Sequence, residues 1–273
     1  RWSYFPSGAI AWRLSEEGFM KHLNFISDAK IRVSYGSTGN NRVPDYAYLS
    51  RVTISSGSGY SFNNVPVNAS AINSLGNLNL KWETTTQSDI GLDLGLFNQR
   101  ISLEADVYKK ITSNLLLNAS VPGSIGFSTA IKNIGKVHNE GREITLNTIN
   151  VNNKKFNWNT NFNISFNRNK VLALSDGQTQ RLTTASWNTL TSSVPLYVAQ
   201  VGRPIAMFYG YIWEGNYQYS DFDQATPGVY TLKKEVPAYT SSTPIQPGYI
   251  KYKDINGDGV INGSDRQYLG TYF

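Results

Sequence analysis

The chain has 273 residues, no cysteine and a formal net charge of +6. Charged residues make up 16%, below the roughly 25% of an ordinary soluble domain, and the basic residues are scattered instead of forming a nucleic-acid-binding stripe. Without cysteine, a disulfide framework and a thiolate metal site are excluded. No apolar run approaches the about 20 residues that a spanning helix needs. The chain begins at Arg1 without Met or a signal peptide, which predicts a missing amino-terminal part.

Apolar and polar residues alternate along several stretches, which is the pattern of a β-strand with one apolar and one polar face. In chain order these predicted strands are 9–14, 30–35, 84–97, 100–112, 144–151 and 155–168. In the clearest of them, Phe156, Trp158, Thr160, Phe162, Ile164 and Phe166 alternate with a row of Asn and Ser at 157–167. Residues 16–24 are expected to form a short helix or a turn, and 208–213 a further aromatic strand.

Two architectures contain such strands: a soluble sandwich, in which the apolar face meets a core, and an outer-membrane barrel, in which it meets lipid. Several stretches reach the 9–11 residues or so that a membrane strand needs. Tight turns at 97–100 and 152–155 alternate with long polar connections at 39–81, 118–136 and 173–203. Short turns on one side and long loops on the other are typical of bacterial barrels, so this pattern favours the barrel.

Several motifs occur together in one order along the chain. They are YGSTGN at 35–40, NLKWETTTQSDIGLD at 79–93, DVYKK at 106–110 with LLL at 115–117, NIG at 133–135 with NEG at 139–141, FYGY at 208–211 and YKDINGDG at 252–259. Together they resemble the SusC/RagA type of TonB-linked outer-membrane transporters, over nearly the whole chain.

The resemblance implies an all-β fold, an antiparallel meander of about ten strands that forms part of a larger transmembrane barrel. Residues 1–273 would be a piece of the carboxy-terminal half, without signal peptide, plug or final strands, because about ten strands cannot close a plugged barrel. The family also implies outer-membrane lipid around the barrel, a SusD-type surface lipoprotein as partner, and import of glycans or peptides driven by TonB through the missing amino-terminal part.

Residues 254–265 fit the spacing of an EF-hand-type calcium loop. The predicted ligands are Asp254, Asn256, Asp258, the backbone carbonyl of Val260, Asn262 through water, and Asp265 in place of the usual Glu. Alternate residues on a tight loop bring their oxygens inward, as Ca²⁺ requires. The flanks read as strand, so we expect a structural calcium site in a β context. The alternative is an Asx-Gly turn without metal.

Three classes of function are considered. A transporter segment is the leading hypothesis, and a soluble, calcium-stabilised glycan-binding or adhesin module is the alternative. An enzyme is not expected, because His22 and His138 are the only histidines and neither lies near a serine motif. The substrate is left open: Tyr46, Tyr48, Tyr60 and Trp187 could stack on sugars or pack within their own loops, and the Asn row could bind solute, water or the plug.

Overall fold

The computed structural model of the chain describes residues 2–175, 177–184, 194–240 and 243–270. In these residues the chain consists of β-strands and short 3-10 helices. None of the helices described is long and apolar enough to cross a membrane. The chain divides into two compact units: unit 1 is Arg1–Thr179 with Val201–Arg203, and unit 2 is Gln180–Gln200 with Pro204–Phe273.

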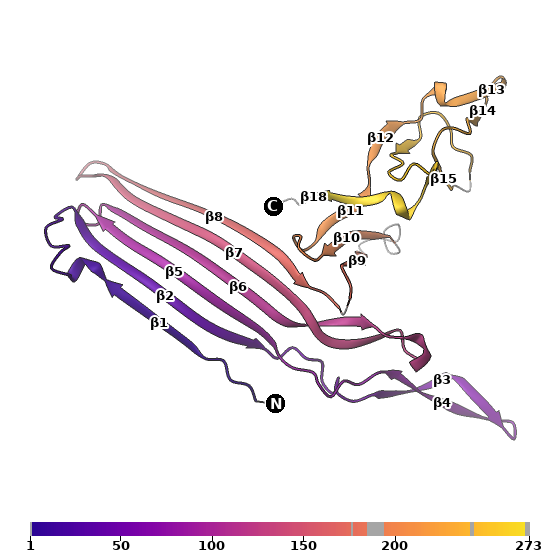
Figure 1. Ribbon diagram of the computed structural model, residues 1–273, viewed down its shortest axis with the longest axis horizontal. Helices are drawn as coiled ribbons and strands as arrows, with labels where there is room; N and C mark the ends of the chain where they lie inside the picture. Colours follow the sequence, from indigo (N-terminus) through magenta and orange to yellow (C-terminus); the bar gives the residue numbers. More distant parts are fainter. Residues whose placement is uncertain (1, 176, 185–193, 241–242, 271–273) are drawn as a thin grey trace. The chain divides into compact units, whose positions relative to one another are not determined.

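Unit 1 is built on a six-stranded sheet with the order β1-β2-β5-β6-β7-β8 (Figure 1). Its strands are β1 (Ser7–Arg13), β2 (Ile26–Asn40), β5 (Glu83–Leu96), β6 (Ile101–Ser120), β7 (Thr129–Asn152) and β8 (Asn157–Ala173). Every neighbouring pair is antiparallel, which confirms the predicted meander. Of the ten or so strands expected, six belong to this sheet, and four more form the main sheet of unit 2.

The register of the sheet separates apolar from polar side chains across all six strands. One row contains Trp12, Ile31, Leu92, Ala105, Ile144 and Ile164. The row beside it contains Ala11, Arg32, Gly91, Asp106, Glu143 and Ser165. Successive residues of a strand point to opposite faces, so the first row belongs to an apolar face and the second to a polar face.

Both predicted tight turns are present. Phe97, Asn98 and Gln99 connect β5 to β6 with φ of 52°, 54° and 63°, in the left-handed region that Asn tolerates better than most residues. Between β7 and β8, the Asn153 side chain accepts hydrogen bonds from the backbone N–H groups of Lys155 and Phe156. Such an Asx turn reverses the chain without help from the rest of the fold.

The predicted loop at 118–136 is wrong, because β6 and β7 continue through it as an extended hairpin whose connection is 121–128. The reason is a bulge: Asn114 adopts a φ of 59°, and the register shifts between Thr112 and Leu116. An extra residue in one strand reverses which positions face which side. The regular alternation in the sequence therefore ends there although the pairing does not.

The other long connections also contain strands. Within 39–81 lies the hairpin of β3 (Arg51–Phe62) and β4 (Val65–Ser74). Within 173–203 lie β9 (Gln180–Thr184) and β10 (Pro195–Gln200), while 185–193 is outside the described residues. The stretch at 16–24, expected as a short helix or a turn, begins at the last residue of the 3-10 helix η1 (Leu14–Glu16) and then continues as turns.

Unit 2 contains a four-stranded sheet and smaller two-stranded pairs. The sheet has the order β18-β11-β10-β9, with β11 (Met207–Tyr211) and β18 (Arg266–Gly270). The pairs are β12 (Trp213–Asn216) with β16 (Ile250–Tyr252), β13 (Phe222–Thr226) with β14 (Val229–Leu232), and β15 (Ala238–Tyr239) with β17 (Val260–Ile261). The 3-10 helices η2 (Gly123–Ile125) in unit 1, and η3 (Tyr219–Asp221) and η4 (Gly263–Asp265) in unit 2, complete the elements.

A small aromatic core holds these pairs together. Tyr217, Phe222 and Ile245 are buried, and Tyr230 and Tyr239 pack against them. The Tyr217 hydroxyl donates a hydrogen bond of 2.8 Å to the carbonyl of Pro237, and burial raises the pKa of Tyr217 to about 12. A buried hydroxyl needs such a partner, so this bond fixes how the core packs.

Candidate functional site

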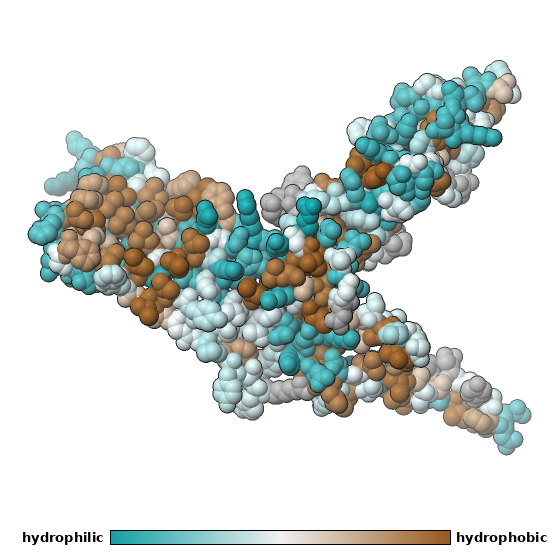
Figure 2. Space-filling model, viewed as in Figure 1, coloured by the Kyte–Doolittle hydropathy of each residue, from teal (hydrophilic) through white to brown (hydrophobic). Residues whose placement is uncertain are grey.

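The apolar face of the six-stranded sheet is exposed. Figure 2 shows it as a continuous brown area over the end of the sheet that carries the tight turns. Ile10 is 78% exposed, Ile90 59%, and Phe166 58%. In a soluble sandwich a second sheet would cover such side chains, and among the described residues none does. An exposed apolar face of this kind fits the barrel interpretation, in which the face meets lipid.

The height of the apolar face fits a membrane. Along β8 and the residue before it, outward-facing side chains from Phe156 to Phe166 span ten residue steps. At roughly 3.3 Å per residue this is about 33 Å along the strand. With the tilt of about 40° usual for barrel strands it becomes about 25 Å, the height of the apolar band of outer-membrane barrels.

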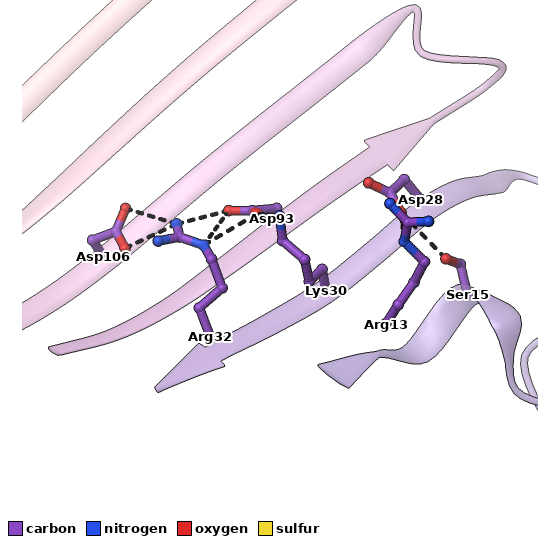
Figure 3. A network of polar contacts seen from close by, with 7 residues as sticks. All are labelled: Arg13, Ser15, Asp28, Lys30, Arg32, Asp93 and Asp106. Atoms are coloured by element: carbon purple, nitrogen blue, oxygen red, sulfur yellow. Dashed lines mark hydrogen bonds and ion pairs between the residues drawn. The ribbon is translucent and has the colours of Figure 1, made fainter. Parts of the chain in front are cut away.

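The polar face carries a network of charges on the central strands (Figure 3). The Arg32 guanidinium on β2 donates to Asp93 on β5 through Nε at 3.0 Å and Nη2 at 2.7 Å. Through Nη2 it also donates to Asp106 on β6, at 3.0 Å. Lys30 Nζ lies 2.7 Å from the second oxygen of Asp93. One arginine thus links three strands, and the two cations balance the two carboxylates.

Gly91 makes this network possible. It is the residue of β5 that lies in register between Arg32 and Asp106. A Cβ at Gly91 would lie 2.7 Å from Arg32 Cζ, where the guanidinium crosses the strand. Gly141 makes room for Tyr108 in the same way, because a Cβ at Gly141 would lie 2.5 Å from Tyr108 Cζ. In both places the absence of a side chain lets a long neighbour lie flat along the sheet.

The Asn row of β8 also lies on the polar face, and part of it cross-links strands. Asn163 donates from Nδ2 to Thr145 Oγ1 on β7 at 3.1 Å, and Asn161 donates to the side chain of Asn147. These side chains are exposed as well. They can therefore meet water or solute while they stabilise the pairing of β7 with β8.

The structure gathers the predicted calcium ligands in one loop, where their oxygens accept backbone hydrogen bonds. Asp254 accepts from the N–H groups of Gly257 at 2.7 Å and Gly259 at 2.8 Å. Asp258 accepts from the N–H of Val260 at 2.8 Å and from Asn256 Nδ2 at 2.9 Å. Gly257 and Gly259 have φ of 74° and 80°, which glycine adopts without strain.

Asp265 is the anchor of this loop. It is fully buried and accepts from the N–H of Ile255 at 2.9 Å and of Asn262 at 2.8 Å. Hydrogen bonds from these backbone amides hold the pKa of Asp265 below its usual range, and the bond from Asn262 has the largest effect. The Asn262 side chain in turn accepts a hydrogen bond from the N–H of Ser264. Asn262 and Asp265 thus form a capping box at the start of the 3-10 helix η4. Among the described residues, no group of three or more His, Asp or Glu side chains lies close enough together to hold a metal ion.

The structure describes only some of the residues considered for sugar stacking or catalysis. Tyr46 and Tyr48 are exposed, and their rings lie 6.4 Å apart within their own loop. Trp187 falls outside the described residues, and of Tyr60 only its backbone position in β3 is described. His138 lies with Nε2 3.7 Å from a Glu140 oxygen.

Sequence reasoning missed the Arg32 network, although its signal was present. Lys30 and Arg32 on one strand, and Asp93 and Asp106 on two others, all occupy polar positions of the alternating pattern. Only the register, which the sequence alone does not give, brings them into contact.

A membrane-height sheet with one exposed apolar face and one polar face defines an outer-membrane β-barrel wall. Comparison with known proteins gives the family. Residues 1–254 match the family described as TonB dependent receptor-like, beta-barrel. The chain is 36% identical to TonB-dependent receptor P3 of Formosa agariphila, over 99% of this chain and 25% of that protein. It is 36% identical to TonB-dependent receptor SusC of Bacteroides thetaiotaomicron, over 65% of this chain and 18% of that protein.

Solved structures agree. The chain superimposes on the RagAB peptide importer in its closed-closed state with a TM-score of 0.71 at 23% identity, over 98% of this chain and 26% of that chain. The open-open state gives a TM-score of 0.69 at 25% identity, over 85% and 24%. The chain belongs to the TonB-dependent receptor β-barrel family and is an outer-membrane protein of the SusC/RagA type. It spans about a quarter of the length of the receptors it matches most fully.

Replacing Arg32 tests the network on the polar face. In the full-length receptor, Arg32→Gln leaves Asp93 and Asp106 without their shared cation. We expect the free energy of unfolding to fall by about 1–2 kcal/mol, because the hydrogen bonds lost are charge-assisted and half-buried. Urea unfolding in detergent, followed by tryptophan fluorescence, measures this. Arg42→Gln, at an exposed position, is the matched control, and equal midpoints for both variants would contradict a stabilising network.

Replacing Asp265 tests the anchor of the loop. Asp265→Asn exchanges one accepting oxygen for an amide, so a buried N–H loses its partner. We expect a lower thermal midpoint of unit 2 in the full-length receptor, measured in EDTA so that no metal contributes. Asp223→Asn, on the exposed strand β13, should leave the midpoint unchanged. If both variants melt alike, Asp265 is not the anchor.

Proposed function

We propose that this chain is a wall segment of a transporter that imports glycans or peptides across the outer membrane. The observation that carries this proposal is the continuous sheet with an apolar face of membrane height and a polar, charged opposite face. Such a sheet separates lipid from a polar interior, which is what a receptor barrel needs. Relatives named as a TonB-dependent receptor and a peptide importer support it.

The same relatives support a partner and an energy source. RagAB is named as a peptide importer, and SusC as a TonB-dependent receptor. We propose that the full-length receptor works with a SusD-type surface lipoprotein and depends on TonB. The β3–β4 hairpin of unit 1 and the loops of unit 2 offer exposed segments that can contact ligands and partners.

Uptake by cells tests the transport proposal. A strain that lacks the full-length gene, complemented with the wild-type gene, should accumulate either labelled oligosaccharides or labelled peptides. The uptake should disappear when tonB is deleted, because the proposed transport depends on TonB. Affinity purification from the same strain should recover a surface lipoprotein in near-equal amount. If neither cargo class enters in a TonB-dependent way, the transport proposal fails.

We also propose that the loop at 254–265 binds Ca²⁺. Its donors are all oxygen, the class that Ca²⁺ prefers, and come from Asp254, Asn256, Asp258, Val260, Asn262 and Asp265. Binding requires some of these oxygens to exchange an amide N–H for the cation. Asp258 is the best placed to do so, because it is exposed and its partners belong to the loop itself.

A titration tests the calcium proposal. The full-length receptor in detergent, stripped with EDTA, should bind Ca²⁺ by calorimetry in the roughly 10⁻⁴–10⁻³ M range typical of extracellular calcium modules. Asp258→Asn should abolish this heat, while Asp223→Asn should retain it. An identical titration for the wild type and Asp258→Asn would assign any binding to another site, and no heat at millimolar Ca²⁺ would leave a metal-free Asx-rich turn.

A further inference from the structure

A group of basic side chains lies on the outward, apolar face of unit 1. The group consists of Lys109 on β6, Arg142 on β7, and Arg168 and Lys170 on β8, and we name it the basic cluster. All four are exposed. The register puts Lys109 and Arg168 on either side of Glu140 in one row, Arg142 beside Phe166, and Lys170 beside His138. The group therefore spans three neighbouring strands, which lie about 5 Å apart.

The basic cluster is not neutralised by the protein. Among the described residues, none of its four side chains makes an ion pair or a side-chain hydrogen bond. Glu140 is the one carboxylate in its rows, and that group lies 3.7 Å from His138. Four cations and one anion leave a charge of about +3 on the surface. On the polar face, by contrast, Arg32 is saturated by carboxylates.

The basic cluster borders the apolar band on the side away from the tight turns. Along β8 the apolar positions end at Phe166, and Arg168 and Lys170 are the next two outward residues. Along β6, Lys109 follows Val107 in the same way. Tight turns mark the periplasmic side of bacterial barrels and long connections the outer side. The basic cluster is therefore at the level of the outer-leaflet headgroups.

We propose that the basic cluster binds the phosphate groups of the outer-leaflet glycolipid, the lipid A part of lipopolysaccharide. Arg and Lys are the side chains that bind phosphate, and basic pockets on membrane proteins hold anionic headgroups. The acyl chains of the same lipid would lie on the apolar side chains below, Phe166 and Val107 among them. This inference rests on the outer-membrane location and the direction of the strands, and is independent of the cargo.

Native mass spectrometry of the detergent-solubilised full-length receptor, titrated with phosphorylated and dephosphorylated lipid A, tests this proposal. We expect the wild type to bind the phosphorylated form more tightly. The variant Arg168→Gln/Lys170→Gln should bind it roughly 5- to 30-fold more weakly, because each basic side chain near a charged bilayer contributes about fivefold. The matched control is Lys154→Gln/Lys155→Gln, which removes the same charge at the tight-turn end and should bind like the wild type.

Three results would overturn the proposal. One is equal affinity of the Arg168→Gln/Lys170→Gln variant and the wild type for phosphorylated lipid A. Another is equal binding of the phosphorylated and dephosphorylated forms to the wild type. The third is complete displacement of the lipid by millimolar inorganic phosphate, which would assign the site to free phosphate. Heat-modifiable migration on gels verifies that each variant is folded. Uptake of cargo is measured separately, so a failure of transport does not touch this result.

Discussion

The pairing register of the six-stranded sheet is the constraint on which the other features of unit 1 depend. In hydrocarbon, backbone N–H and C=O groups have no water to bond, so strands must pair along their full length. Once paired, a slip of one residue exchanges the two faces. It would turn Arg32 and Asp106 toward lipid, and Leu92 toward the interior. A single register thus determines the position of the apolar band, the Arg32 network and the basic cluster. A slipped register would disrupt all three, so each of them disfavours it.

Two glycines let long side chains lie flat on the polar face of the sheet. At Gly91 and Gly141, a longer neighbour lies across the strand in the space where a side chain would have stood. Arg32 thereby reaches a carboxylate two strands away instead of projecting from the sheet. The bonds run along the wall, so the charged groups stabilise strand pairing and leave the interior open. In a barrel that encloses other material, a wall of this kind resists separation of its strands without filling the lumen.

The strands of unit 1 were predictable from the sequence because period-two alternation is a local property. Prediction failed where that period is interrupted. The bulge at Asn114 reverses the faces, so the outer part of the β6–β7 hairpin read as a loop. Unit 2 was largely unpredictable, since its strands are short and its core joins Tyr217 to Ile245, far along the chain. In the loop at 254–265, the spacing identified the oxygen-bearing residues. It did not show that the carboxylates accept hydrogen bonds from backbone amides, because that depends on whether a cation competes for the same oxygens.

The two faces of the sheet use charge in opposite ways. On the polar face, Lys30 and Arg32 are balanced by Asp93 and Asp106 within contact distance, which suits a surface whose task is to hold strands together. On the apolar face the basic cluster lacks matching carboxylates, although such residues are costly next to lipid unless a counter-charge or water reaches them. Glu or Gln at these positions would have avoided the excess charge. An uncompensated cationic group at headgroup level is stable when the membrane itself supplies the anions, so the surrounding lipid completes the electrostatics of this wall.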